Sequence, residues 1–541
     1  TMARLISRRE GVSVILAGEI ERNGERYVLE VRALDPGLEP VDGDPLAVAR
    51  ASADSRDDVL EAVGRIASEL RGDLGDTTPK SDRQAVAETF TAASVEAMSA
   101  YAEGQELLAQ GRFKEAIELY QRAVDEDPEF GRAYAGMGVA YGNLRREAAA
   151  EASYQQAFKH LDRMTERERY RTLGGYYLLV SKNFDKAIES YRDLVDAFPA
   201  DGVGHSNLAF AYLSVRDFDR AVESGRRAVE LEPNNIIKRI NYAMYALYAG
   251  DFETAITESK TVLEQNPDFG YALFTIGRAA GAAGDMKAAH EAFEELDASD
   301  GMGSSLAPMG HGDLALYRGR NRDAVRLLEP AVVASENPFE MASMLVALAE
   351  ARLALGDTEG ALADAGRAVE LSEQESVLYF AARLLLAAGR DDEAEAIAIE
   401  LENRLQSLAT SLSGLIRAEL ALGDGQLGTA LREIRWAREE YDFWMVHYLA
   451  GLTYMQAEQY PEAFDEFDHC VRDKGEITDV FLADSATLRY FPPALYWLGR
   501  CHEALGNAEA AGERYREYLA IRGDAEPPGE LAADAAARLA G

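Results

Sequence analysis

The chain has little of what many binding and redox chemistries require, because cysteine, histidine and positive charge are all scarce. Two cysteines, Cys470 and Cys501, and seven histidines are spread over 541 residues. The 56 basic residues are outnumbered by 94 acidic ones, for a formal net charge of −38. Since phosphate backbones and anionic membranes bind proteins through Lys and Arg, this balance argues against nucleic acid or a lipid surface as a partner. We predict that both cysteines are small core residues, as free cysteine commonly is.

The sequence also lacks long hydrophobic runs and the motifs of common enzymes. No apolar stretch approaches the ~20 residues that cross a bilayer, so membrane attachment would need a helix outside this segment. The His-Glu pairs at His290 and His502 open a zinc-protease pattern, but Glu294 and Gly506 stand where the second histidine is required. Asp268-Phe269-Gly270 matches a kinase triplet, yet no catalytic loop or phosphate loop precedes it. We predict no catalytic residue, no metal and no cofactor, and therefore no enzyme activity in this segment.

What the sequence does contain, from residue 97 to residue 541, is a pattern of small and aromatic residues that returns about every 34 positions. Gly104 and Gly138 are 34 residues apart, and so are Tyr120 and Tyr154. A period of this length indicates a solenoid of helical hairpins. The small residues are needed because two antiparallel helices approach closely only where side chains are small, while bulky residues fill the gaps between turns.

The unit at residues 97–128 shows the pattern in full. Its first helix is predicted to end near Gly111, and its second before Pro128. The unit resembles the tetratricopeptide repeat, whose eight signature positions hold Ala100, Glu103, Gly104, Leu107, Ala116, Tyr120, Ala123 and Pro128. The first two depart from the family pattern. The resemblance implies a mainly α protein: a right-handed α-solenoid of about twelve such hairpins, closed by a capping helix that starts near Gly529.

The repeat register divides the chain into five segments. Residues 1–75 lack the period and are predicted to form a small α/β domain that is N-terminally truncated, and residues 76–93 form a linker and the entry to the first helix. Regular repeats occupy residues 94–300. Divergent repeats follow at 301–440, and regular repeats with the capping helix complete the chain at 441–541.

The N-terminal segment has its own local signals. Residues 12–20 and 26–34 are predicted strands, joined by a turn at Asn23. Residues 55–74 have the apolar spacing of an amphipathic helix, which we expect Ser55 to cap. These elements predict the small α/β domain.

The inner surface of the solenoid is where we expect a ligand. In this repeat, five positions of the first helix (the second, fifth, ninth, twelfth and thirteenth) line the concave groove and are not needed to hold hairpins together. From the third to the sixth unit these positions carry apolar and aromatic side chains: Tyr176, Leu179, Phe210, Leu213, Ile240, Met244, Tyr248 and Phe274. Such a surface suits an apolar protein or peptide ligand. Alternatively, the N-terminal domain, a neighbouring turn of the superhelix or a second copy of the chain, as in a homodimer, covers it; the sequence leaves both hypotheses open.

Longer stretches carry a more specific resemblance. The segment VILAGEIERNGERYVLEVRALDP, the helix SRDDVLEAVGRIASELRGDLGD and the ending YFPPALYWLGRCHEALGNAEAAGERYREYLAI are similar to the region that follows the kinase domain in bacterial eukaryotic-like serine/threonine kinases. Similar segments occur in some bacterial transcriptional regulators. The resemblance implies a non-catalytic sensor or scaffold of a signalling protein, placed on the extracytoplasmic (periplasmic) side as part of a single-pass membrane protein. The alternative is an interaction domain of a cytoplasmic transcriptional regulator. A kinase role would belong to a longer gene product.

Overall fold

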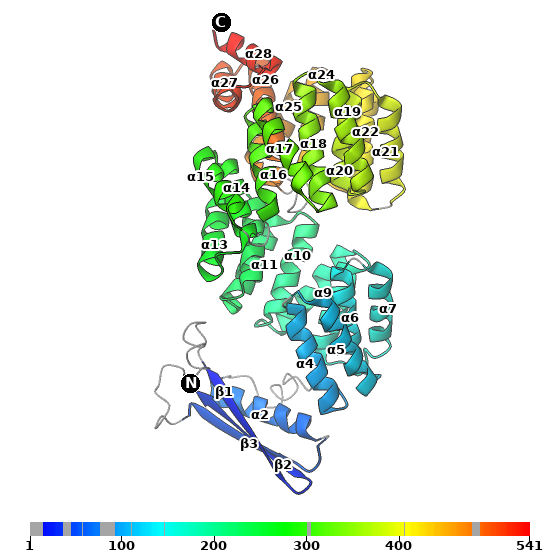
Figure 1. The fold of residues 1–541 in the computed structure, drawn as a ribbon, viewed down its shortest axis with the longest axis vertical. Helices are drawn as coiled ribbons and strands as arrows, with labels where there is room; N and C mark the ends of the chain where they lie inside the picture. Colours follow the sequence, from blue (N-terminus) through cyan, green and yellow to red (C-terminus); the bar gives the residue numbers. More distant parts are fainter. Residues whose placement is uncertain are drawn as a thin grey trace. The chain divides into compact units, whose positions relative to one another are not determined.

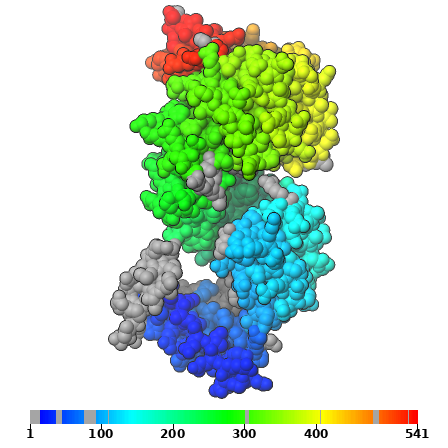
Figure 2. Space-filling view, in the orientation of Figure 1, coloured from blue at the N-terminus to red at the C-terminus, as the bar shows by residue number. Residues whose placement is uncertain are grey.

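The computed structural model describes residues 14–35, 45–56, 58–75, 92–109, 111–144, 146–299, 304–404, 406–478, 487–527 and 529–540. The start of the first predicted strand and most of the predicted linker lie outside these ranges. The chain divides into two compact units, Thr1–Asn234 (unit 1) and Asn235–Gly541 (unit 2). Figure 1 shows the helices of each unit arranged as successive antiparallel pairs. Figure 2 shows that side chains close the surface over neighbouring hairpins.

Unit 1 begins with a small sheet and one helix. Three antiparallel strands, β1 (Ile15–Asn23), β2 (Arg26–Leu34) and β3 (Ala47–Ala53), lie in the order β1-β2-β3. Helix α2 (Val59–Asp73) packs on one face of the sheet (Figure 1). The core between them consists of small and branched apolar side chains: Leu29, Ala33, Ala49, Ala53, Ala62, Ile66 and Leu70.

The predicted hairpin and helix are both present, but two details differ. The helix begins at Val59, and its N-cap residue is Asp58. Ser55 does not cap it, because the Ser55 hydroxyl donates instead to the Asp58 carboxylate at 2.8 Å; that prediction was wrong. Strand β3 was not predicted at all, since the residues it buries are alanines, which give a weak apolar alternation.

The rest of unit 1 is a series of four helical hairpins. Their helices are α4 (Val95–Ala109), α5 (Phe113–Glu126), α6 (Gly131–Asn143), α7 (Glu147–Phe158), α8 (Glu166–Leu179), α9 (Phe184–Ala197), α10 (Gly202–Ser214) and α11 (Phe218–Leu231). Helix α5 packs on α6 and α9 packs on α10, whereas the second and third hairpins meet mainly through α6 and α8.

Unit 2 continues with eight hairpins and a final helix. Its α-helices are α12 (Ile236–Tyr248), α13 (Phe252–Gln265), α14 (Gly270–Ala283), α15 (Met286–Asp297), α16 (Ala307–Tyr317), α17 (Asn321–Ala334), α18 (Pro338–Ala354), α19 (Thr358–Leu371), α20 (Glu375–Ala387), α21 (Asp391–Glu402), α22 (Ser407–Gly423), α23 (Leu427–Glu440), α24 (Trp444–Gln456), α25 (Tyr460–Arg472), α26 (Pro492–Ala504), α27 (Ala508–Arg522) and α28 (Glu530–Ala540). Three short 3₁₀ helices are η1 (Ser304–Leu306), η2 (Lys474–Thr478) and η3 (Leu488–Tyr490). The described residues thus form twelve hairpins, and the predicted fold class, mainly α with a small α/β domain in front, is confirmed. Among these helices, none has the length together with the apolar character that crossing a membrane requires.

Several hairpins close where a glycine meets an aromatic ring sixteen residues later. A Cβ added to Gly138 would lie 2.6 Å from the ring of Tyr154, and one added to Gly451 would lie 2.7 Å from the ring of Phe467. Both rings are fully buried. Since real Cβ atoms do not approach so closely, glycine is the residue that fits these two positions.

Replacing Gly138 by alanine tests this packing. Because the new methyl group must displace the buried Tyr154 ring, we expect Gly138→Ala to lower the free energy of unfolding by about 1–3 kcal/mol. Gly142, on the same helix, is the matched control, since its added Cβ would lie 3.7 Å from Leu179, an ordinary contact. Gly142→Ala should be neutral or stabilising by up to about 1 kcal/mol through helix propensity. Thermal melts of both variants decide the matter, and equal melts would contradict the packing argument.

Helix α28 covers the last hairpin, as the predicted capping helix should. It packs on α27 and α26. Ala532 and Ala535 face the hairpin and are buried, while Arg538 donates two hydrogen bonds to the Glu503 carboxylate at 2.6 and 2.8 Å. The helix therefore shields apolar surface that the last repeat would otherwise expose.

A charge on either side of α28 tests the capping role. Ala535 is fully buried, so Ala535→Asp would bury an unpaired carboxylate and should cost about 2 kcal/mol or more and reduce solubility. Ala536 is exposed, and Ala536→Asp should change stability by less than about 0.5 kcal/mol. Soluble yield and melting temperature of the two variants are the measurements. If both variants behave like the wild type, α28 does not cap the repeats.

Candidate peptide-binding faces

The eight residues predicted to line a groove divide equally between the two units. On unit 1 they are Tyr176 and Leu179 of α8 with Phe210 and Leu213 of α10; on unit 2 they are Ile240, Met244 and Tyr248 of α12 with Phe274 of α14. Their exposure differs widely. Phe210 is 37 % exposed, whereas Leu213, Ile240, Tyr248 and Phe274 are buried, and the other three are half-buried.

On unit 1 two exposed apolar side chains, Val203 and Phe210, lie on one side of α10. Val203 is 43 % exposed and lies seven residues before Phe210, a spacing that places both on one face of the helix. Half-buried Tyr176 packs edge-on against Phe158, with ring centroids 4.9 Å apart, and Leu179 lies one turn further along α8. We call Tyr176, Leu179, Val203 and Phe210 the apolar face of unit 1.

A buried carboxylate fixes the start of α10. The Asp201 side chain accepts a hydrogen bond from the Gly204 backbone at 2.8 Å and so caps the helix. Burial alone would raise its pKa, but the guanidinium groups of Arg171 and Arg167, each 2.8 Å away, lower the pKa of Asp201 to about 2. This ion-pair network ties α8 to α10 and sets the spacing of the apolar face.

On unit 2 the corresponding surface is covered by a segment of the same chain. The 3₁₀ helix η2, between α25 and α26, packs against α12 and α14. A Cβ on Gly475 would lie 2.5 Å from the carbonyl oxygen of Tyr248, so the two backbones are in close contact. Arg278 of α14 donates a hydrogen bond to the carbonyl oxygen of Thr478, and its guanidinium group lies 5.5 Å from the ring of Phe274.

A second stretch between α25 and α26, Thr487–Phe491, also covers unit 2. It contains an arginine, Arg489, that two carboxylates bind. Asp313 of α16 accepts hydrogen bonds from the backbone N–H groups of Leu488 (3.1 Å) and Arg489 (3.3 Å) and from the Arg489 guanidinium group (3.0 Å). Glu350 of α18 accepts two further bonds from Arg489, at 2.6 and 3.3 Å, and one from the Tyr490 hydroxyl. Burial raises the pKa of Asp313, and the charge of Arg489 opposes this shift.

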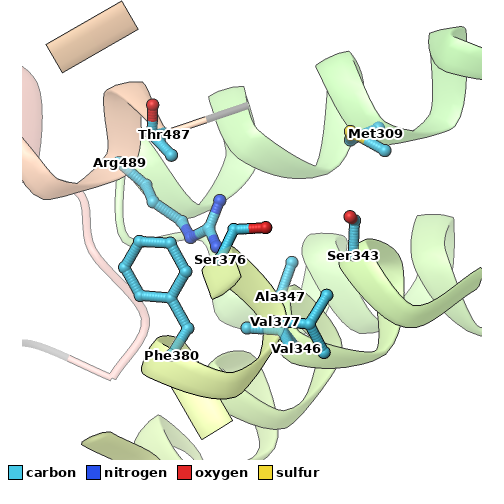
Figure 3. A pocket seen from close by; sticks show the side chains of 9 residues that line it. All are labelled: Met309, Ser343, Val346, Ala347, Ser376, Val377, Phe380, Thr487 and Arg489. Atoms are coloured by element: carbon cyan, nitrogen blue, oxygen red, sulfur yellow. The ribbon is translucent and has the colours of Figure 1, made fainter. Parts of the chain in front are cut away.

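Aromatic rings complete this contact. The ring of Tyr490 stacks on Phe380 of α20 with centroids 4.8 Å apart and planes inclined by 12°. Figure 3 shows the Arg489 side chain extending toward Ser376 and Phe380. The cavity left among these side chains measures about 20 Å³, which is room for a single water molecule. The segment therefore fits its surface closely.

The charged residues of unit 2 were missed in the sequence, although a signal for them existed. All of them occupy the ninth position of the first helix in the repeat register, eleven residues before the repeat alanine of the second helix. They are Arg278, Asp313, Glu350, Arg383 and Glu419. Reading that position onward through the divergent repeats would have found them. The same position holds Tyr176 and Phe210 in the last two hairpins of unit 1 and Met244 in the first hairpin of unit 2, so at α14 it changes from apolar to charged.

A larger cavity lies further along the same series of first helices. It measures about 270 Å³ and is lined by residues of α20, α22 and α24: Arg383, Glu419, Leu422, Gly423, Met445, Tyr448, Leu449 and Leu452. Arg383 and Glu419 form an ion pair at 2.9 Å in its wall. The cavity combines one half-buried ion pair with apolar walls, which is the usual composition of a ligand site.

The other residues considered in the sequence have structural surroundings. Cys470 and Cys501 are free and fully buried, as predicted, and burial raises the pKa of Cys501 to about 12. Asp268 lies in the turn before α14, whose N-cap residue Phe269 is buried in the apolar core. The described part of the chain contains no group of three or more His, Cys, Asp or Glu side chains placed to hold a metal ion.

Two stacked histidines, His447 and His469, lie beside η2, and the pKa of His447 is strongly shifted. His447 lies 2.7 Å from Glu466 and 3.2 Å from Asp442, and its ring stacks on that of His469 with centroids 3.7 Å apart. Arg438 shares the Glu466 carboxylate at 2.8 Å. Burial alone would lower the pKa of His447, but hydrogen bonds to Asp442 and Glu466 raise it to about 9.

This shift predicts a pH-dependent contribution to stability. The pKa of His447 is raised in the folded state, so its charged form stabilises the fold fully below the unfolded pKa of about 6.5, and the stabilisation is lost as pH rises through about 9. Relative to His447→Gln, the wild type should be more stable by on the order of 3 kcal/mol near pH 6, with little difference near pH 9.5.

His502 provides a control of opposite sign. Burial lowers its pKa, so the wild type should gain stability relative to His502→Gln as pH rises. Thermal melts of the three proteins at the two pH values are the measurement. A His447→Gln difference that does not shrink between pH 6 and pH 9.5 would contradict the assignment.

Comparison with known proteins agrees with the repeat pattern. A tetratricopeptide-repeat profile matches residues 173–236, 242–302, 309–376 and 483–526, and two further profiles of this repeat match residues 104–144 and 131–159. No curated protein matches the sequence.

Solved structures that resemble the chain share only low identity with it. They include a tetratricopeptide repeat protein from Parabacteroides merdae (18 % identity, 46 % of this chain and 98 % of that chain, TM-score 0.35) and yeast Tom70 (12 %, 82 % and 95 %, 0.36). The human IFIT1 dimer with m7Gppp-AAAA is another (15 %, 72 % and 90 %, 0.38). At these identities the similarity concerns the fold alone. The profile matches and the twelve hairpins together identify the chain as a tetratricopeptide-repeat protein.

Proposed function

We propose that this chain is a scaffold that binds a protein or peptide partner on the apolar face of unit 1. Tetratricopeptide-repeat proteins bind peptide or protein partners, and they are typically non-catalytic. The observation that supports this proposal is the exposure of Phe210 and Val203 on one side of α10. The stacking of the hairpins does not use this side, so an aromatic ring there is available to a ligand.

The composition of the face suggests the chemistry of its partner. Phe210 and Val203 offer apolar contact, and the half-buried Tyr176 on α8, which packs against Phe158, is the second aromatic ring of the face. The chain carries a net charge of −38, whose field attracts cationic groups and speeds their association. A peptide or amphipathic helix with apolar anchors flanked by Lys or Arg fits both properties.

Two serine substitutions test this proposal. Peptides are first selected on the wild-type chain from a random display library, and their affinities are then measured by calorimetry. Phe210→Ser should weaken binding by about 2 kcal/mol or more, because aromatic anchors dominate such interfaces. Val333→Ser is the matched control, since Val333 on α17 is 79 % exposed and lies outside the face, and it should bind like the wild type.

Stability and mass measurements separate the alternatives. Since Phe210 is 37 % exposed, Phe210→Ser should lower the melting temperature only modestly and leave the chain folded. A dimer in light scattering that dissociates on Phe210→Ser would identify a second copy of the chain as the occupant instead. Equal affinity of both variants for the selected peptides would remove the apolar face from consideration.

A narrower proposal concerns the protein to which this scaffold belongs. The resemblance of β1, β2, α2 and the last repeats to the post-kinase region of bacterial serine/threonine kinases supports a sensor or scaffold on the extracytoplasmic side of a membrane-anchored kinase. The alternative is the interaction domain of a cytoplasmic transcriptional regulator. The coding sequence upstream of Thr1 distinguishes them: a kinase domain with a membrane helix supports the first, and a DNA-binding domain supports the second.

A further inference from the structure

The segment Thr487–Phe491 makes the contacts that a bound peptide makes. Asp313 accepts hydrogen bonds from two consecutive backbone N–H groups, those of Leu488 and Arg489. Asp313 therefore recognises the main chain of the segment and not only one side chain. Glu350 and Asp313 then bind the Arg489 guanidinium group, and Phe380 stacks on the next side chain, Tyr490. Main-chain bonds combined with two side-chain subsites are typical of peptide binding.

The surface that makes these contacts belongs to the repeats. Asp313, Glu350 and Arg383 come from the first helices of three successive hairpins, at the groove position where partners of such repeats are expected. Arg383 closes the far side of the subsite, with its guanidinium group 5.6 Å from the Tyr490 ring. Residues Asp313 and Arg489 are 176 positions apart in the sequence, so the repeats and the segment are separate elements that meet in the fold.

We call the surface formed by Asp313, Glu350, Phe380 and Arg383 the charged face of unit 2. We infer that this face is a binding site for a short peptide in which an arginine is followed by an aromatic residue, and that Thr487–Phe491 occupies it as an intramolecular ligand. This rests on the proposed function, since it names a second partner class for the same scaffold. The arginine provides specificity: without a cation, the buried Asp313 carboxylate and the half-buried Glu350 carboxylate would both lose their charged partner, so a ligand lacking the guanidinium group is rejected.

The internal segment Thr487–Phe491 competes with a free peptide for the charged face, because the segment is covalently attached to the repeats. A segment attached to the repeats at both ends is present at an effective concentration in the millimolar range, so a free peptide of the same sequence is excluded from the wild-type chain. The 270 Å³ cavity beside Arg383 lies next along the first helices and is where a longer ligand gains contacts that the internal segment does not make. A partner with an Arg-aromatic pair and apolar residues beyond it would therefore displace the segment.

Removing the two internal side chains that fill the subsites tests this inference in the full-length chain. The variant Arg489→Ala/Tyr490→Ala removes both internal side chains but leaves Asp313, Glu350 and Phe380 in place. The probe is a fluorescent, end-blocked peptide Thr-Leu-Arg-Tyr-Phe, and its binding is measured by anisotropy. We expect at least tenfold tighter binding to the double variant than to the wild type, and at least a tenfold loss when glutamine replaces the arginine of the peptide. Arg514→Ala, which removes a surface ion pair with Glu517, is the control and should behave like the wild type.

Each remaining outcome overturns the inference. A folded double variant that does not bind the peptide shows that the surface holds its own segment for structural reasons only. Equal binding to the wild type and the double variant places the peptide elsewhere. If circular dichroism shows the double variant unfolded, Arg489→Lys replaces it: the peptide should raise its melting temperature in a dose-dependent way, and no rise overturns the inference.

The result is independent of the test on unit 1. Phe210→Ser leaves the charged face intact and should not change binding of the Arg-aromatic peptide to the double variant. Loss of the unit 1 interaction with retention of this one, or the reverse, therefore shows which of the two proposals has failed.

Discussion

The contact that closes several of the hairpins is that between a glycine and the aromatic ring sixteen residues later. At Gly138 and Tyr154, and again at Gly451 and Phe467, the ring occupies the space where a Cβ would be. This contact brings the two helices of a hairpin together over one side of the first helix. The opposite side of that helix does not take part in closing the hairpin, so its residues are available to bind a ligand.

The two units use this freedom in different ways. In unit 1 the ninth groove position holds Tyr176 and Phe210, and part of the apolar surface remains exposed. In unit 2 the same position holds Asp313 and Glu350, whose charges are too costly to leave buried and unpaired. Arg489 pairs with both of them. Covering of the charged face by the chain itself is therefore the expected consequence of its composition, whereas an apolar surface of modest size can remain open to solvent.

Local patterns in the sequence were sufficient to predict the repeats. Glycine and aromatic residues sixteen apart lie within one hairpin, so their spacing is preserved in the sequence as a period, and the capping helix has its own apolar pattern. Strand β3 was missed because its buried residues are alanines, and Ser55 was given a capping role that its bond to Asp58 excludes. The segment that covers unit 2 could not be predicted, because its hydrogen bonds to Glu350, Asp313 and Arg278 join residues 139 to 200 positions apart and have no period.

The net negative charge of the chain favours basic ligands at both the apolar face of unit 1 and the charged face of unit 2. An excess of acidic residues creates a field that draws basic segments toward the protein from a distance, but it does not decide where they bind. That decision is made at short range, where the geometry of Asp313 and Glu350 accepts a planar guanidinium group in a way that an ammonium group cannot reproduce. On unit 1 the corresponding choice depends on apolar area around Phe210. Basic flanking residues would therefore speed association with both faces, while an arginine or an apolar anchor would determine which face is occupied.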